Sequence, residues 1–142
     1  MRPLFALLCI CATAGFAQAG VPLANTDFET DLDADGLPDH WNRRADETGS
    51  VSIDLTVAHS GQASLRIRHE RPSSYSYVYQ GVDNAWPGQR LVASVWVRCE
   101  GIKTRGFGPR LYCGYEGGLS HHAAGPVLDE RGNCDWQQVT VP

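Results

Sequence analysis

Residues 25–41 read NTDFETDLDADGLPDHW and combine a cluster of carboxylates with two aromatic residues, Phe28 and Trp41. Within this stretch three aspartates alternate, a glycine follows at once, and a further aspartate comes four residues after the third. A chain that turns at the glycine can direct these oxygens towards one point, and Ca²⁺ takes oxygen ligands of this kind. The stretch therefore predicts a structural calcium loop formed by Asp31, Asp33, Asp35, the carbonyl of Leu37 and Asp39.

The spacing differs from that of a helix-loop-helix calcium site. Counting Asp31 as the first position, the twelfth is Asn42, where such a site needs a bidentate glutamate. Pro38 and the polar flanking residues also disfavour helices on either side. The alternative is an acidic turn without an ion, because Asp and Gly favour turns by themselves.

The length and charge of the chain indicate a single domain without a nucleic-acid partner. Its 142 residues carry a net charge of -4 and a pI near 5.6, which gives no basic field for nucleic acid. Residues 1–19 read as a secretory signal peptide, with Arg2 near the start, an apolar run to Ile10 and small residues before Gly20. No other apolar stretch approaches the roughly 20 residues that span a bilayer. We therefore expect residues 20–142 to form a soluble domain, secreted to the extracellular space or periplasm, with no membrane partner.

The cysteines indicate one structural disulfide. Cys9 and Cys11 leave with the leader, so three cysteines remain in an oxidising compartment. Cys99 ends one apolar alternation and Cys113 lies within the next, so adjacent antiparallel strands can bring these two together as a bridge. A bridge from Cys113 to Cys134 is the open alternative. The cysteines lack the paired C-x-x-C spacing of a zinc site.

Beyond Trp41 the sequence alternates between apolar and polar residues with a period of two, which is typical of strands with one buried face. These alternations cover residues 53–57, 63–68, 75–82, 91–100, 110–115 and 136–141, with turn residues between them. No helical periodicity of useful length follows the leader. The pattern predicts an all-β fold, an antiparallel β-sandwich. Because the chain stops directly after a strand, we expect a module that lacks its closing strand or strands.

Several ordered segments resemble the galactose-binding-like β-sandwich modules of carbohydrate-binding families 4 and 9, also called CenC-type. The segments are NTDFE at 25–29, GLPDHW at 36–41, AHSGQASLRI at 58–67, YQGV at 79–82, PG at 87–88 before the strand at 91–98, and WQQVTV at 136–141. The resemblance implies a jelly roll, a structural calcium near the first strand and a glycan-binding groove. It also implies that Glu29 helps to bind calcium together with an acidic residue of the last strand. This metal model competes with the aspartate loop alone.

The tyrosines of the third alternation are the candidates for sugar binding. Sugar rings stack on flat apolar surface while neighbouring polar groups bind their hydroxyls. Alternate residues of a strand share a face, so an outward face would present a row of aromatic rings; the alternative is that these tyrosines belong to the core. The predicted sugar-binding residues are Tyr75, Tyr77 and Tyr79, extended on neighbouring strands by Trp96, Arg98 and Tyr112.

Catalysis has little support in the sequence. There is no G-x-S-x-G, H-E-x-x-H or phosphate-loop motif. We therefore expect a secreted, non-catalytic module that binds a polysaccharide and accompanies further domains, such as a glycoside hydrolase, on a longer chain. The alternatives are a structural or adhesive sandwich that binds no sugar, and a polysaccharide hydrolase or lyase in its own right.

Overall fold

The computed structural model describes residues 4–9, 23–45, 49–69, 76–81, 92–102, 111–113, 123–124 and 132–141. These residues form strands and no helix, which confirms the prediction of an all-β chain. The strands are β1 (Leu4–Cys9), β2 (Asn42–Arg44), β3 (Gly49–Asp54), β4 (Ser64–His69), β5 (Tyr77–Tyr79), β6 (Ala93–Ile102), β7 (Tyr112–Cys113), β8 (Ala123–Ala124) and β9 (Gly132–Val141). Within the same ranges, no helix is long and apolar enough to cross a membrane.

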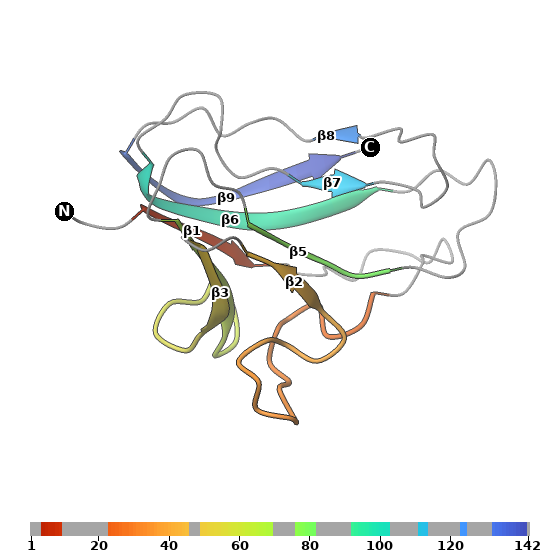
Figure 1. The fold of residues 1–142 in the computed structure, drawn as a ribbon. Coiled ribbons are helices and arrows are strands. Elements are labelled where there is room, and N and C mark those ends of the chain that lie inside the picture. Colours follow the sequence, from red (N-terminus) through yellow and green to blue (C-terminus); the bar gives the residue numbers. More distant parts are fainter. Residues whose placement is uncertain are drawn as a thin grey trace.

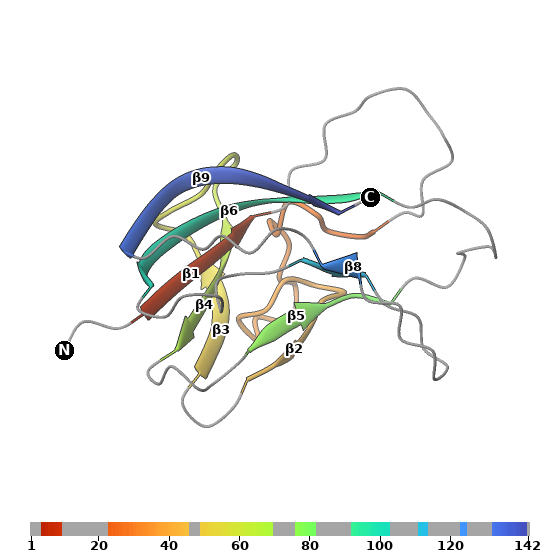
Figure 2. The same ribbon diagram turned by 90° about the horizontal axis from the view of Figure 1, so that it is seen from above.

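The strands form three antiparallel sheets. The largest has five strands in the order β3-β4-β1-β6-β9, and two smaller sheets pair β2 with β5 and β7 with β8. Figure 1 shows β9, β6 and β1 running side by side, and Figure 2 shows β2 and β5 set apart from this large sheet. The predicted pairing of two neighbouring alternations is confirmed, because β3 pairs with β4 and places Ile53 opposite Leu65. The predicted bounds of the first strand, 53–57, are wrong: β3 covers Gly49–Asp54, and Leu55 beyond its end is exposed.

β1 consists of residues that the sequence assigns to the signal peptide. It lies in the middle of the five-stranded sheet and is antiparallel to both neighbours, with Leu7 opposite Arg66 of β4 and Arg98 of β6. As a central strand, β1 has its backbone paired with a neighbour on each side. The predicted leader thus has a structural consequence: removing residues 1–19 takes a central strand out of the sheet.

The core lies on one face of this sheet. Val95, Val97 and Cys99 alternate along β6 and are all buried, while Leu65 on β4 has no exposed surface. Two aromatic residues from the loop before β2 join them: Phe28 and Trp41 pack edge to face with ring centroids 5.3 Å apart. Val78 of β5 packs against the same cluster. We call residues 25–39 the acidic loop. The large sheet, the acidic loop and the β2–β5 sheet therefore share one hydrophobic core.

Candidate functional site

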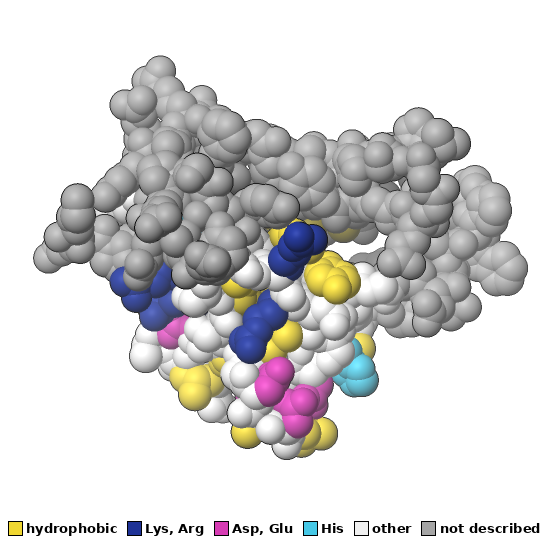
Figure 3. All heavy atoms as spheres, in the orientation of Figure 1, with side chains coloured by type: hydrophobic (Ala, Val, Ile, Leu, Met, Phe, Trp, Pro, Cys, Tyr) yellow, Lys and Arg dark blue, Asp and Glu magenta, His cyan; other side chains and the backbone are white. Residues whose placement is uncertain are grey.

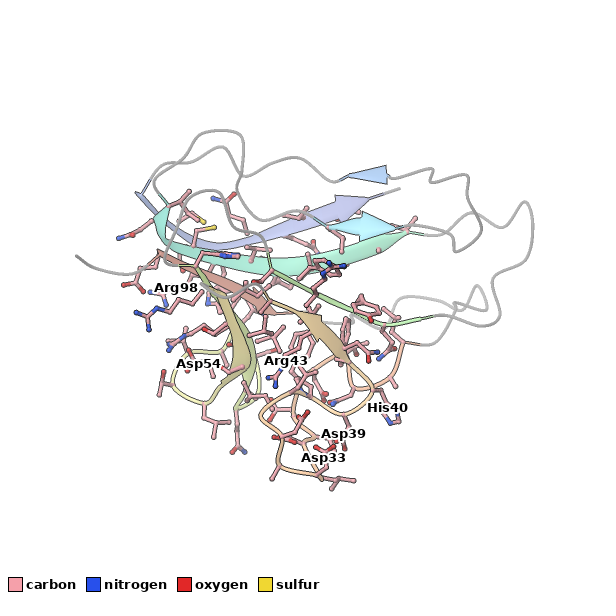
Figure 4. All side chains as sticks on the ribbon, in the orientation of Figure 1. Asp33, Asp39, His40, Arg43, Asp54 and Arg98 are labelled. Carbon is pink, nitrogen blue, oxygen red and sulfur yellow. The ribbon has the colours of Figure 1, made fainter. Side chains whose placement is uncertain are left out.

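Three aspartates of the acidic loop come together in the structure. Asp31, Asp33 and Asp39 each offer one carboxylate oxygen, and these oxygens all lie within 4.8 Å of one another. The acidic side chains gather on the loop below the sheets, where Figure 4 labels Asp33 and Asp39 (Figures 3 and 4). Three converging carboxylates repel one another unless a cation lies between them.

The hydrogen bonds within the loop leave one buried carboxylate oxygen without a partner. Backbone N–H groups of Gly36 and Leu32 donate to Asp31 Oδ2 and Asp39 Oδ1, each at 3.1 Å. The N–H of Asp35 donates to Asp33 Oδ1 at 3.3 Å. Asp31 Oδ1 is buried and has no hydrogen-bond partner. Because buried polar atoms in folded proteins are nearly always paired, this oxygen fits direct coordination of a hard cation such as Ca²⁺.

Asn25 holds the two ends of the loop together. Its side-chain amide donates to the carbonyls of Thr30 and Asp39, at 2.7 and 3.0 Å, and its Oδ1 accepts from the N–H of Thr30 at 3.2 Å. The indole N–H of Trp41 donates to the Asn25 carbonyl at 2.9 Å. Asn25, Ala34 and His40 have φ angles of 48°, 57° and 71°, in the left-handed region that costs energy for residues other than glycine. The loop is thus pinned at its base by hydrogen bonds and core packing.

Two other predicted ligands do not join the three aspartates. Asp35 Oδ1 accepts the N–H of Leu37 at 2.8 Å and caps the turn. Glu29 Oε1 accepts the N–H groups of Gln62 and Ala63, at 2.7 and 3.1 Å, in the turn before β4. A Cβ on Gly61, where φ is +69°, would lie 2.1 Å from this oxygen, so glycine leaves the space that Glu29 fills. The structure thus brings together three carboxylates of the aspartate loop and places Glu29 in a different turn.

A surface of two tyrosines and two polar side chains lies on the β2–β5 sheet. Tyr77 and Tyr79 are 38% and 50% exposed, and their ring centroids are 5.8 Å apart. In the antiparallel register Tyr79 lies opposite Asn42 and Tyr77 opposite Arg44. Opposite residues project from the same face of a sheet, so both exposed polar side chains flank the rings. We call these four residues the tyrosine surface.

The opposite face of this small sheet anchors it to the core. Val78, between the two tyrosines, packs against the hydrophobic cluster. Arg43, its partner in register, donates to the carbonyl of Val51 on β3 at 3.1 Å. Asn42 and Arg44 were not predicted as site residues, because a three-residue strand rich in charge reads as a turn. The only sequence signal for them is their position beside a tyrosine alternation.

The remaining predicted sugar-binding residues lie elsewhere. Trp96 and Arg98 belong to β6 in the large sheet and are half-buried, so they do not extend the β2–β5 face. His59 stacks on Trp96, with ring centroids 4.2 Å apart and an interplanar angle of 15°, and also packs edge-on against Trp136. A stacked imidazole covers part of the indole face that a sugar would use. Tyr75 and the side chain of Tyr112 lie outside the described residues.

One partly buried ion pair links two neighbouring strands of the large sheet. Asp54 at the end of β3 is buried and pairs with Arg66 of β4. Burial acts to raise the pKa of Asp54, but hydrogen bonds from the hydroxyl and N–H of Thr56, together with the Arg66 charge, outweigh it and hold the pKa below its ordinary value. A carboxylate held in its charged form and tied into its own turn has a structural role.

The register of β6 and β9 places two of the three remaining cysteines opposite each other. Cys99 of β6 lies directly opposite Cys134 of β9, and both are buried thiols. Cys113 lies on β7, which pairs with β8 rather than with β6. The bridge from Cys99 to Cys113 stays a prediction, and the register offers Cys134 as a directly opposite partner for Cys99.

Comparison of this chain with protein-family models, with curated protein sequences and with solved structures found no match.

Proposed function

We propose that residues 20–142 form an exported, non-catalytic carbohydrate-binding module that binds a polysaccharide on the tyrosine surface. The observation that carries this proposal is the exposed pair Tyr77 and Tyr79, with Asn42 and Arg44 opposite them in register. The rings offer apolar area for the C–H faces of sugar rings, and the amide and guanidinium can bind hydroxyl groups beside them. Two neighbouring exposed rings can each stack on one sugar ring of a polymer.

We also infer that a calcium ion held by Asp31, Asp33 and Asp39 supports this surface. Gln80, which directly follows Tyr79, connects the two. Its Oε1 accepts the N–H of Ala24 at 2.7 Å, and its Nε2 donates to the carbonyls of Ala24 and His40, each at 3.1 Å. Ala24 and His40 flank the acidic loop in the sequence. An ion that fixes the loop therefore also fixes the strand that presents the tyrosines.

The finer fold that we propose is a β-sandwich of the jelly-roll type. It is supported by the shared core, in which Val78 of the β2–β5 sheet packs against a cluster that includes Val51, Val95 and Val97 of the large sheet. Packing of one antiparallel sheet on another through a common hydrophobic layer defines this architecture. In it the tyrosine surface is the outer face of the smaller sheet.

Affinity gel electrophoresis against a panel of soluble polysaccharides tests the proposed function. We expect one or more polysaccharides to retard the protein, and Tyr77→Ala or Tyr79→Ala to abolish most of the retardation. Leu55→Ala is the matched control, because Leu55 is an exposed apolar residue outside the tyrosine surface. Retardation that survives both tyrosine substitutions would exclude the tyrosine surface as the polysaccharide-binding site. Absence of binding to any glycan would favour a structural or adhesive domain.

A further inference from the structure

β1 occupies a position that the exported chain is predicted to lose. Five residues of β1 pair with β4 and five with β6, from Leu4 opposite His69 to Cys9 opposite Trp96. Without residues 1–19, the facing edges of β4 and β6 have no strand between them. Unpaired N–H and C=O groups along two sheet edges are costly, and such edges readily pair with an added strand.

We propose that the exported chain takes an extended segment of another polypeptide into the slot between β4 and β6, with apolar side chains at alternate positions and an acidic side chain between them. This is strand addition, in which main-chain hydrogen bonds supply affinity and the side chains of the edge strands set specificity. The inference rests on the predicted removal of the leader, a premise that it shares with the proposed function, and it does not depend on sugar binding.

One face of the slot requires apolar side chains. The residues that border it on this face are Leu65 and Ile67 of β4 and Val97 and Cys99 of β6. Leu65, Val97 and Cys99 are buried in the core, and Ile67 packs against it. The strand positions between these residues are those of Ala6 and Leu8, so an incoming strand needs apolar residues at the same two positions.

The other face of the slot favours a negative charge. The position of Leu7 lies between Arg66 on β4 and Arg98 on β6. Figure 4 labels Arg98 and Asp54 on the left of the view, and Asp54 of β3 pairs with Arg66 across β4 from the slot. Cross-strand neighbours of opposite charge stabilise a sheet, so a glutamate or aspartate at this position would be paired on both sides. The leader has leucine at this position, so β1 itself places no charged residue between the two arginines.

The position of Phe5 is an internal control for the charge preference at the position of Leu7. The position of Phe5 lies between Arg68 on β4 and Glu100 on β6, so it faces one charge of each sign. An acidic and a basic residue are therefore expected to be accepted about equally at the position of Phe5. The charge preference of the slot is confined to the position of Leu7.

Labelled peptides test the slot directly. The exported protein is purified, and its intact mass establishes that residues 1–19 are absent. Peptides copying residues 4–9, with Cys9→Ser and either Leu7→Glu or Leu7→Lys, are titrated by fluorescence anisotropy. We expect saturable binding of both, with the glutamate peptide about tenfold tighter. Arg98→Gln should remove most of that preference, whereas Glu100→Gln should keep it. The same charge exchange at the position of Phe5 should change affinity by less than about threefold.

Hydrogen exchange supplies the second measurement and covers the case of an unstable exported chain. Peptide binding should slow exchange of the backbone amides of β4 and β6 that face the slot. If the exported chain is unfolded alone, the glutamate peptide should restore its strand signal in circular dichroism. The intact chain, produced without export so that β1 stays in place, should bind neither peptide.

Several results would overturn the proposal. One is an exported protein that retains residues 1–19. A second is protection of the β4 and β6 amides without peptide, together with no peptide binding, which would mean that the two strands close on each other. A third is equal affinity for the glutamate and lysine peptides at the position of Leu7.

Discussion

The side-chain amide of Gln80 donates a hydrogen bond to the backbone carbonyl of His40, with 3.1 Å between the nitrogen and the oxygen. Gln80 belongs to the segment that carries the tyrosines, and His40 directly follows the last aspartate of the acidic loop. The same amide pairs with both backbone groups of Ala24 at the other end of the loop. The geometry of the loop and the geometry of the tyrosine surface are thus linked through one side chain.

Replacing Gln80 should uncouple the acidic loop from the tyrosine surface. In the parent protein we expect removal of calcium to weaken polysaccharide binding. Gln80→Leu should weaken binding about tenfold even with calcium present, because three hydrogen bonds worth about 1 kcal/mol each or less are lost. A chelator should then have little further effect. Gln138→Leu, at an exposed position on β9, is the control. A Gln80→Leu protein that binds sugar as tightly as the parent would show that the link carries no function.

Calcium should stabilise the fold through the aspartate loop. An ion that binds only the folded state at about 100 times its Kd adds about 2.7 kcal/mol to the free energy of unfolding. We expect melting curves in calcium and in chelator to differ by several degrees for the parent protein and to coincide for Asp31→Asn.

The melting temperature of Asp31→Asn in chelator is a second test of the aspartate loop. Asp31→Asn should melt no lower than the parent in chelator, because it relieves repulsion among Asp31, Asp33 and Asp39. Asp27→Asn removes a charge outside this group and should keep the calcium effect. Identical melting of the parent with and without calcium would reduce the loop to an acidic turn.

The pair formed by Asp54 and Arg66 should make stability depend on pH. The pKa of Asp54 is lowered in the folded state, so its contribution is present above the ordinary pKa of 3.8 and is lost as pH falls below that value through the folded pKa. Urea denaturation between pH 7 and pH 3 should show this loss, and Asp54→Asn should flatten it. Arg66→Gln should cost about 2 kcal/mol at pH 7, less than a fully buried pair because Arg66 is partly exposed. An unchanged pH profile in Asp54→Asn would contradict the assignment.

Oxidation should join Cys99 to Cys134. Residues directly opposite in antiparallel strands have Cα atoms about 4.5 to 5.5 Å apart, within the range that a disulfide spans. A disulfide oxidant would accept the two electrons while the two thiols lose their protons. Non-reducing peptide mapping should then find this linkage, worth about 3 to 4 kcal/mol, in Cys113→Ser but not in Cys134→Ser. A peptide that links Cys99 to Cys113 would restore the bridge predicted from the sequence.

Local patterns predicted those elements whose position depends on their own residues. The alternations of Ile53 and Leu65 give β3 and β4. The alternating aspartates before Gly36 anticipate Asp31 and Asp33, which meet Asp39 from outside that motif. β2 is different, because its three residues form a strand only through pairing with β5. Asp35 could not be separated from its neighbours by spacing, since its role depends on the N–H of Leu37.

Pairings between distant segments escaped the sequence for the same reason. Cys134 becomes the partner of Cys99 only through the register of β6 and β9, which includes irregularities on both sides of the pair. The stacking of His59 on Trp96 joins residues of separate segments and removes Trp96 from the expected aromatic row. The sequence of β1 indicates a leader because it is a short apolar run that follows Arg2. Its position in the middle of the sheet depends on pairing with β4 and β6, which the sequence does not show.

The most direct test of sugar binding is nuclear magnetic resonance of the isotope-labelled exported protein, titrated with an oligosaccharide cut from the polysaccharide that retards it most. We predict that the signals that move most belong to Tyr77, Tyr79, Asn42 and Arg44, and that they move along one saturable curve. Shifts confined to Trp96 and its neighbours on β6, or no shifts at saturating oligosaccharide, would contradict a binding surface on β2 and β5.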